Sequence, residues 1–273
     1  MSFCWVLTSN SQPRFVEPGN GTQSVTEKLG LATMDWTQLG LLGTGIGEGS
    51  RGRLDLETAR KEARKNAEEN AFNKLFRSVS MLPVNENETV GTIFKQKPEV
   101  KLLADQILHQ FDVKDVVFFS NGGIEIQVEV SITPLLPGIL GTSKGKPPID
   151  PVSKEGKVLY SGLIVDTEGL IFYPVLSPLL LAEDGMVLYG PEKVLGDALH
   201  KRGMVSYHPS LESAQKDPRV GQNPLIVKAL RLETRDALVI PSHKARSLQQ
   251  SNLNLNFLEE GRLIIVLPMQ KSS

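Results

Sequence analysis

The sequence predicts an α+β protein with two small domains, an N-terminal helix-on-antiparallel-sheet unit and a C-terminal strand-rich α/β unit. Three observations predict it: an alanine-rich amphipathic helix, an Asn-Gly hairpin downstream of it, and a proline-rich stretch that separates both from a series of short apolar runs. We therefore expect an irregular extension (1–35), an α+β domain (36–133), a linker (134–156) and a strand-rich α/β domain (157–270).

Composition limits the class of protein. The chain has 273 residues, of which 40% are hydrophobic and 22% are charged, which is typical of a globular protein with enough apolar material for two cores. The net charge of −1 gives no electrostatic reason to expect a nucleic-acid partner. Cys4 is the single cysteine, so no internal disulfide can form.

The first domain opens with a strand and a long helix. Residues 36–46 show a half-alternating apolar pattern that ends in glycines, which indicates a strand. Asp55 is a suitable N-cap for the helix that follows, and Pro83 ends it. The predicted buried stripe of this helix recurs at about every fourth residue: Ala59, Ala63, Ala67, Ala71 and Leu75, widened by Phe72, Phe76 and Val79.

A second helix and a hairpin complete the first domain. Apolar residues at helical spacing predict a helix over residues 99–110. Strands at 113–119 and 124–132 flank Asn121-Gly122-Gly123, and Asn-Gly is a strong hairpin signal. Apolar and polar residues alternate in the return strand, so we expect one face to be buried and the other to face water.

The second domain is predicted to consist of strands with one crossover helix. We expect a strand at 158–165, a hairpin around Asp184-Gly185, and a helical or irregular stretch over 192–214. Apolar runs predict three further strands, at 224–232, 236–241 and 261–268. A helix capped by Ser242 is expected between the last two of them.

The glycine-rich stretch "GTGIGEGS" at residues 43–50 is not expected to bind a phosphate. A dinucleotide fingerprint places three glycines at the turn from a parallel strand into a helix, and a P-loop ends in Gly-Lys-Ser/Thr. This stretch matches the first pattern only in part, lacks the second, and is followed by two helices and a hairpin. We interpret it as the glycine-flanked end of a strand.

Candidate reactive groups are scattered. The four histidines lack metal-ligand spacing, and Gly141-Thr-Ser143-Lys-Gly145 matches a hydrolase elbow but lies in the proline-rich stretch. We therefore name no catalytic, cofactor-binding or metal-binding residue and expect no cofactor. The possible ligand or interface contacts are Lys228 and Arg231, two cations in an otherwise apolar run.

Two regions carry a resemblance to a known family. "LETARKEARKNAEENAFNKLFRSV" (56–79) and the C-terminal "YSGLIVDTEGL", "PLLLAEDGMVLYG" and "NPLIVKALRL" resemble the bacterial outer-membrane lipoprotein family, LPP-twenty-like, that includes the flagellar-assembly lipoprotein FlgP. The resemblance covers residues 36–270. It implies an exported envelope protein, lipid-anchored in many members and ring-forming around the flagellar motor in some, without a catalytic set.

Three functions stay open. The preferred one is a non-enzymatic structural or assembly protein of the bacterial envelope that acts as a homo-oligomer, with strands 237–241 and 261–268 as candidate pairing edges. The second is a ligand-binding module whose C-terminal domain holds a glycan or small anion. The third is an enzyme of unrecognised type.

The expected location follows from the resemblance. It implies the periplasm or the periphery of the outer membrane, with other envelope or flagellar proteins as partners. The first ten residues have neither the basic segment nor the long apolar segment of a signal peptide, so a cytoplasmic location also stays open.

Overall fold

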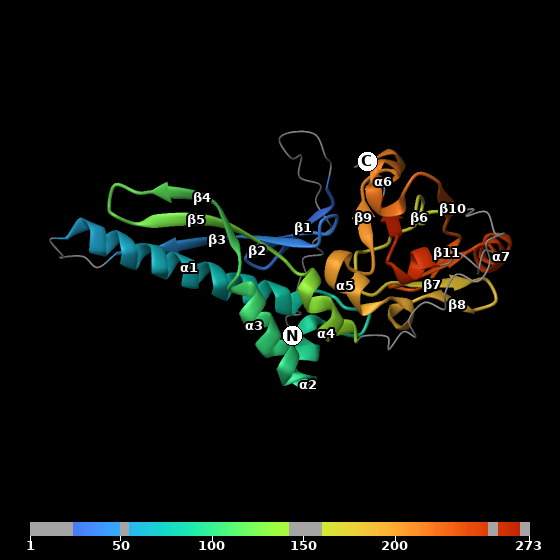
Figure 1. The fold of residues 1–273 in the computed structure, drawn as a ribbon, viewed down its shortest axis with the longest axis horizontal. Coiled ribbons are helices and arrows are strands. Elements are labelled where there is room, and N and C mark those ends of the chain that lie inside the picture. Colours follow the sequence, from blue (N-terminus) through green and yellow to red (C-terminus); the bar gives the residue numbers. More distant parts are fainter. Residues whose placement is uncertain (1–23, 50–54, 142–159, 251–255, 268–273) are drawn as a thin grey trace, which may run out of the picture.

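The structure is a computed structural model that describes residues 24–49, 55–141, 160–250 and 256–267. It confirms the α+β class. An elongated N-terminal unit, built of an antiparallel sheet and a long helix, projects from a more compact C-terminal unit that contains two further sheets (Figure 1).

The N-terminal sheet has five strands, all antiparallel to their neighbours, in the order β1-β2-β3-β5-β4. The predicted hairpin forms its β4–β5 edge, and the alternation of buried and exposed residues in β5 is as expected. The strands are β1 (Thr26–Leu29), β2 (Ala32–Asp35), β3 (Gly40–Gly47), β4 (Asp112–Phe118) and β5 (Ile124–Ser131).

The expectation of an irregular extension over residues 1–35 is wrong for its last part. Residues 26–35 form the β1–β2 hairpin, which turns at Gly30 with a positive φ of 58°. Each strand has four residues, too few for a recognisable period, and β2 becomes a sheet strand by pairing with β3. Residues 1–23 lie outside the described residues.

Helix α1 (Leu56–Met81) covers one face of this sheet. Asp55 is its N-cap and accepts a hydrogen bond from the amide of Glu57, as predicted. Most of the expected stripe is buried, and Ala59, Phe72 and Phe76 are half-buried at its margins. We call α1 together with β3, β4 and β5 the finger.

The chain between α1 and β4 holds two helices, not one: α2 (Val90–Gln96) and α3 (Pro98–Leu108). The second corresponds to the helix expected at 99–110. The first was missed because it has only seven residues, and its capping box uses Thr89 with Thr92 in place of the usual Glu or Gln.

The expected linker begins later than predicted. Residues 133–140 form a 3-10 turn, η1 (Thr133–Leu135), and a short helix, α4 (Leu136–Leu140), with buried leucines. Each begins with a proline in its first turn, where the missing N–H costs no helix hydrogen bond. Residues 142–156, which include Ser143 of the hydrolase-like motif, lie outside the described residues.

The C-terminal unit contains two four-stranded sheets. The order of the first is β10-β6-β13-β9, with every pair parallel, and the order of the second is β11-β12-β7-β8, with only β12 and β7 parallel. The expected Asp184-Gly185 hairpin joins β7 to β8. The strands are β6 (Gly162–Asp166), β7 (Leu179–Ala182), β8 (Val187–Tyr189), β9 (Ser206–His208), β10 (Pro224–Lys228), β11 (Arg231–Thr234), β12 (Ala237–Ile240) and β13 (Leu263–Val266).

Two strand predictions need correction. The run 224–232 is not one strand, because the chain leaves the first sheet after Lys228 and enters the second at Arg231. The candidate pairing edges 237–241 and 261–268 are wrong as well: β12 and β13 each lie between two neighbouring strands. Their uninterrupted apolar sequences fit strands buried on both faces.

Short helices connect these strands. The stretch 192–214, expected to be helical or irregular, contains strand β9 between two helices. The crossover helix begins at Ser242, whose amide donates to a carboxylate oxygen of Glu183 at 2.6 Å. The helical elements are η2 (Pro191–Lys193), α5 (Gly196–Arg202), α6 (Leu211–Lys216), η3 (Pro218–Val220), α7 (Ser242–Gln250) and α8 (Asn256–Glu259).

The two units share one apolar core. The ring of Trp36, from the N-terminal unit, meets the ring of Tyr207 on β9 edge to face, with centroids 5.8 Å apart. Thr37 Oγ1 donates to the carbonyl of Tyr207 at 2.6 Å, and Ser206 Oγ donates to the carbonyl of Thr37 at 2.8 Å. The boundary at 134–156 therefore separates the sheets in sequence but not their cores.

Candidate functional site

The glycines of "GTGIGEGS" form a packing surface. Gly43, Gly45 and Gly47 lie inside β3, an antiparallel strand, and all three face α1. A phosphate-binding site would need the glycines in the turn between a parallel strand and the N-terminus of the following helix. Residues 50–54, which follow, lie outside the described residues.

Lys228 and Arg231 do not converge on a shared site. Lys228 ends β10 and its Nζ lies 2.8 Å from Glu168 Oε2, whereas Arg231 begins β11 in the other sheet and pairs with Glu233. The hydrogen bond and charge of Glu168 raise the pKa of Lys228, and the same contact lowers the pKa of Glu168. Both pairs are exposed, so they contribute little to stability.

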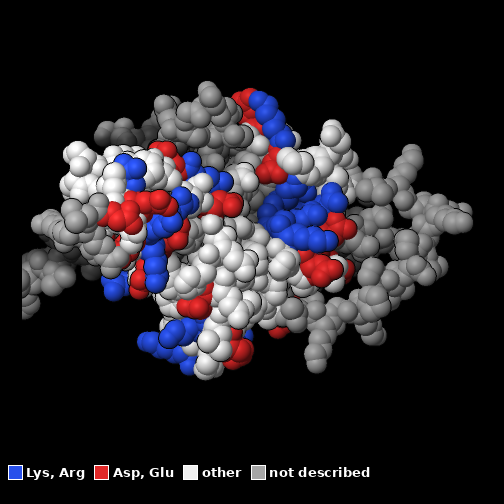
Figure 2. All heavy atoms as spheres, turned by 60° about the vertical axis from the view of Figure 1, so that its left-hand side comes forward, with Lys and Arg blue, Asp and Glu red and all other residues white. Residues whose placement is uncertain are grey.

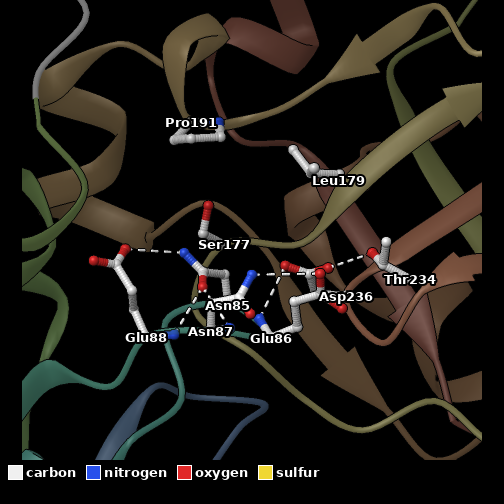
Figure 3. Close-up of a pocket in the computed structure, with 9 residues that line it drawn as sticks. All are labelled: Asn85, Glu86, Asn87, Glu88, Ser177, Leu179, Pro191, Thr234 and Asp236. Atoms are coloured by element: carbon white, nitrogen blue, oxygen red, sulfur yellow. Dashed lines mark hydrogen bonds between the residues drawn. The ribbon is translucent and has the colours of Figure 1, made fainter. Parts of the chain in front are cut away.

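A pocket of about 420 Å³ lies where the two units meet. Figure 3 shows Leu179 and Pro191 on one side of it and the loop of residues 85–88, with Asp236, on the other. Sequence reasoning missed this pocket because its lining comes from segments up to about 150 residues apart: Asn85, Glu86, Asn87, Glu88, Ser177, Leu179, Pro191, Thr234 and Asp236.

The polar groups of this pocket fasten the units together. The Asp236 carboxylate accepts the amide of Glu86 at 3.1 Å and the hydroxyl of Thr234 at 2.6 Å, and only 5% of the residue is exposed. Asn85 Oδ1 accepts the amides of Asn87 and Glu88, both at 2.9 Å. Asp236 and Asn85 therefore hold the loop of residues 85–88 in place.

The chemistry of the lining disfavours an anion. Its charged residues are Glu86, Glu88 and Asp236, and the named lining contains neither lysine nor arginine. A neutral polyol or a cationic group would suit it better than a phosphate or carboxylate. In the part of the chain that the structure describes, no three His, Cys, Asp or Glu side chains are placed to hold a metal ion.

A second polar cluster surrounds His208, at the end of β9. Its Nε2 lies 2.9 Å from Asp217 Oδ2 and its Nδ1 lies 3.3 Å from Ser213 Oγ, which donates to the carbonyl of Ser210 at 2.9 Å. The histidine is 5% exposed. The residue types are those of a hydrolytic triad. Here, however, they connect His208 on β9 to Ser213 within α6 and to Asp217 directly after it. The arrangement is that of a structural clasp.

Asp217 is held in its ionised form within this cluster. Burial acts to raise its pKa, but the hydrogen bond from His208 and the backbone hydrogen bond from Arg219, together with the charges of these two residues, hold that pKa below its ordinary value. Sequence reasoning did not bring His208 and Asp217 together, since the two residues belong to different elements and meet only in the fold.

The far end of the finger exposes large apolar side chains. The β4–β5 turn and the first turn of α1 lie at the same end, farthest from the C-terminal unit (Figure 1). The exposed apolar residues there are 41–63% accessible, and we call them the tip: Ile46, Leu56, Val117, Phe118 and Phe119. Sequence reasoning treated this hairpin only as an element of the fold.

Charged residues are distributed in small mixed groups. Figure 2 brings the finger end forward and shows lysines and arginines next to acidic residues, with a broad uncharged area between the groups. No extended surface of one sign is visible on this face, in keeping with the net charge of −1. This face gives no electrostatic footprint for nucleic acid.

No helix within the described ranges is both long and apolar enough to cross a membrane.

Residues 162–269 match the family model described as Treponema pallidum Tp0624, second domain. No curated protein matches the chain. The match spans β6 to β13 and leaves out the finger; it does not show the resemblance to FlgP. The C-terminal unit is therefore similar to the second domain of a bacterial protein, Tp0624.

Proposed function

We propose that the protein is a non-enzymatic assembly component of the bacterial cell envelope that acts through self-association. The observation that carries this proposal is the outer edge strand of the finger, β4. It is the last strand of its sheet, is seven residues long, and has a half-buried apolar flank, Val113 and Val116. An unpaired strand edge with an apolar flank favours pairing with another chain.

The backbone of β4 supports this reading. The amide of Val116 donates to the side chain of its neighbour Asp115 at 2.9 Å. This local hydrogen bond can be exchanged for one to a strand of another chain. The ladder to β5 is irregular between Val113 and Asp115, where Lys114 is the extra residue. Such a bulge with a lysine protects an edge against indiscriminate pairing.

Light scattering over a concentration series from 1 to several hundred micromolar tests the proposal. We expect discrete assemblies, and we expect Val116→Pro to reduce their mass, because proline removes the amide and stiffens the edge. Leu42→Lys is the control: Leu42 is an exposed residue on β3, which β5 separates from the β4 edge, and its replacement should leave the mass unchanged. A wild-type monomer at the highest concentration contradicts self-association.

The envelope location and the flagellar link rest on the sequence resemblance to FlgP-like proteins, and the similarity to a domain of bacterial Tp0624 supports a bacterial setting. Immunodetection of the protein in fractionated cells of its source tests the location. Recovery only in the cytoplasmic fraction would refute it.

A ligand-binding role is the second candidate, and the pocket at the joint favours it. Its acidic and amide lining supports the glycan form of that hypothesis, and the ion pairs of Lys228 and Arg231 disfavour the anion form. A thermal-shift screen with neutral sugars, peptidoglycan fragments and nucleotides tests it. Stabilisation by a sugar that Leu179→Arg abolishes would support this role over the first.

A further inference from the structure

We propose that the tip of the finger inserts into the surface of an electrically neutral phospholipid bilayer. This inference goes beyond the proposed self-association and does not require it. It starts from position: the tip lies at the end of a projecting two-layer finger (Figure 1). Phe118 is 63% exposed and Leu56 is 57% exposed, values at which an apolar side chain is largely in water.

The tip is uncharged over a continuous stretch. Residues 116–124, Val-Val-Phe-Phe-Ser-Asn-Gly-Gly-Ile, contain no ionisable side chain. The stretch includes the whole hairpin turn and three of the five tip residues. Charged groups are costly to bring into the apolar part of a membrane, so an uncharged projecting turn is the part of this surface that can leave water most easily.

Three backbone amides of this turn have partners within it. The amide of Phe119 donates to the carbonyl of Gly123 at 2.9 Å, and the amide of Gly122 donates to the carbonyl of Phe119 at 3.0 Å. The amide of Gly123 donates to Asn121 Oδ1, also at 3.0 Å. A backbone group without a partner would oppose transfer from water into lipid, and these groups already have partners.

The size of the tip favours a membrane over a protein partner. Taking on the order of 200 Å² for each large side chain, five side chains that are 41–63% exposed offer roughly 500 Å² of apolar surface. A stable protein interface buries about 800 Å² on each partner. The tip alone is too small for such an interface, whereas a bilayer needs no complementary shape.

The charged residues behind the tip determine which lipid surface it can bind. Glu125 lies between Ile46 and Val117 in the sheet register, so it marks how deep the hairpin can enter. Asp115 is exposed farther along β4. These carboxylates would be repelled by an anionic surface, which is why a zwitterionic phosphatidylcholine surface is the expected partner and added phosphatidylglycerol should not strengthen binding.

Vesicle flotation with the full chain tests the inference. We expect wild-type protein to float with phosphatidylcholine vesicles and the double variant Phe118→Ser/Phe119→Ser to bind more than tenfold more weakly. Leu102→Ser is the matched control, because Leu102 is 68% exposed on α3, away from the tip, and its loss should leave flotation unchanged. Circular dichroism should show that all three proteins are folded.

The inference is overturned by no flotation of the wild type, by equal flotation of the double variant, or by binding that requires phosphatidylglycerol. Light scattering of the double variant separates this inference from the proposed function. A reduced assembly mass would make the tip a protein contact and not a lipid contact. Assemblies that persist without any vesicle binding would leave self-association standing and remove only the membrane role.

Discussion

Gly45 on β3 lies directly under the backbone of Ala67 on α1. A Cβ atom added to Gly45 would be 2.0 Å from the carbonyl oxygen of Ala67 and 2.8 Å from the Cβ of Ala71, and one added to Gly47 would be 1.9 Å from the carbonyl oxygen of Ala63. Glycines on the strand and alanines on the helix therefore fix the thickness of the finger. The pattern that resembles a nucleotide-binding loop in sequence is a helix-packing groove.

Substitution of Gly45 tests this packing. Gly45→Ala forces the helix backbone away from the sheet, because the contact is with backbone atoms that cannot rotate aside. We expect a loss of about 3 kcal/mol in the free energy of unfolding, at the upper end of the range for overpacked cores, measured by urea denaturation. Gly40→Ala is the control: it lies on the same strand, and its added Cβ would be 3.5 Å from the nearest atom. Equal effects of both variants would contradict the packing argument.

Thr37 tests whether the two units unfold together. Its hydroxyl oxygen accepts the amide of Val25 at 2.9 Å and donates to the carbonyl of Tyr207 at 2.6 Å, in a buried position. Thr37→Val preserves the shape and leaves both backbone groups without this partner, so we expect a loss of about 2 kcal/mol or more. The exposed Thr44→Val should change stability by less than about 0.5 kcal/mol.

The same titration reports cooperativity. Because the units share a core, tryptophan fluorescence and far-ultraviolet circular dichroism should give one coincident transition for the wild type and for Thr37→Val. Two separated transitions in the wild type would show that the units are independent domains.

Glu27 predicts a specific pH dependence. Burial raises the pKa of its carboxyl above 4.5, and the hydrogen bond from Trp36 Nε1 at 2.9 Å opposes that shift without cancelling it. A raised pKa in the folded state means that this group favours folding most when it is protonated, below pH 4.5, and that its contribution is lost as the pH rises through the folded-state value. Glu27→Gln should therefore be more stable than the wild type at pH 7.

Urea titrations of both proteins between pH 4 and pH 8 measure this difference. The gain in stability of Glu27→Gln should shrink as the pH falls and disappear below pH 4.5. The glutamine carbonyl can still accept the hydrogen bond from Trp36, so a constant difference across the range would show that packing, and not ionisation, is responsible.

The elements whose signals are local could be predicted from the sequence alone. The stripe from Ala63 to Leu75 repeats at the helical period, Asp55 caps the helix within two residues, and Asn121-Gly122 closes a hairpin whose return strand alternates with a period of two. In each case the signal and the structure that it specifies lie within one or two turns of chain, so no distant residue is needed to read them.

The pairing of the strands and the surfaces left exposed depend on tertiary contacts. The four-residue strands β1 and β2 are strands because β3 completes their sheet, and the run from Pro224 to Leu232 divides because its two halves find different partners. β12 and β13 changed from expected edges to central strands for the same reason. The pocket of Asn85 and Asp236 and the core contact of Trp36 and Tyr207 join residues some 150 to 170 positions apart. Their formation depends on long-range burial, which a local pattern of apolar residues does not encode.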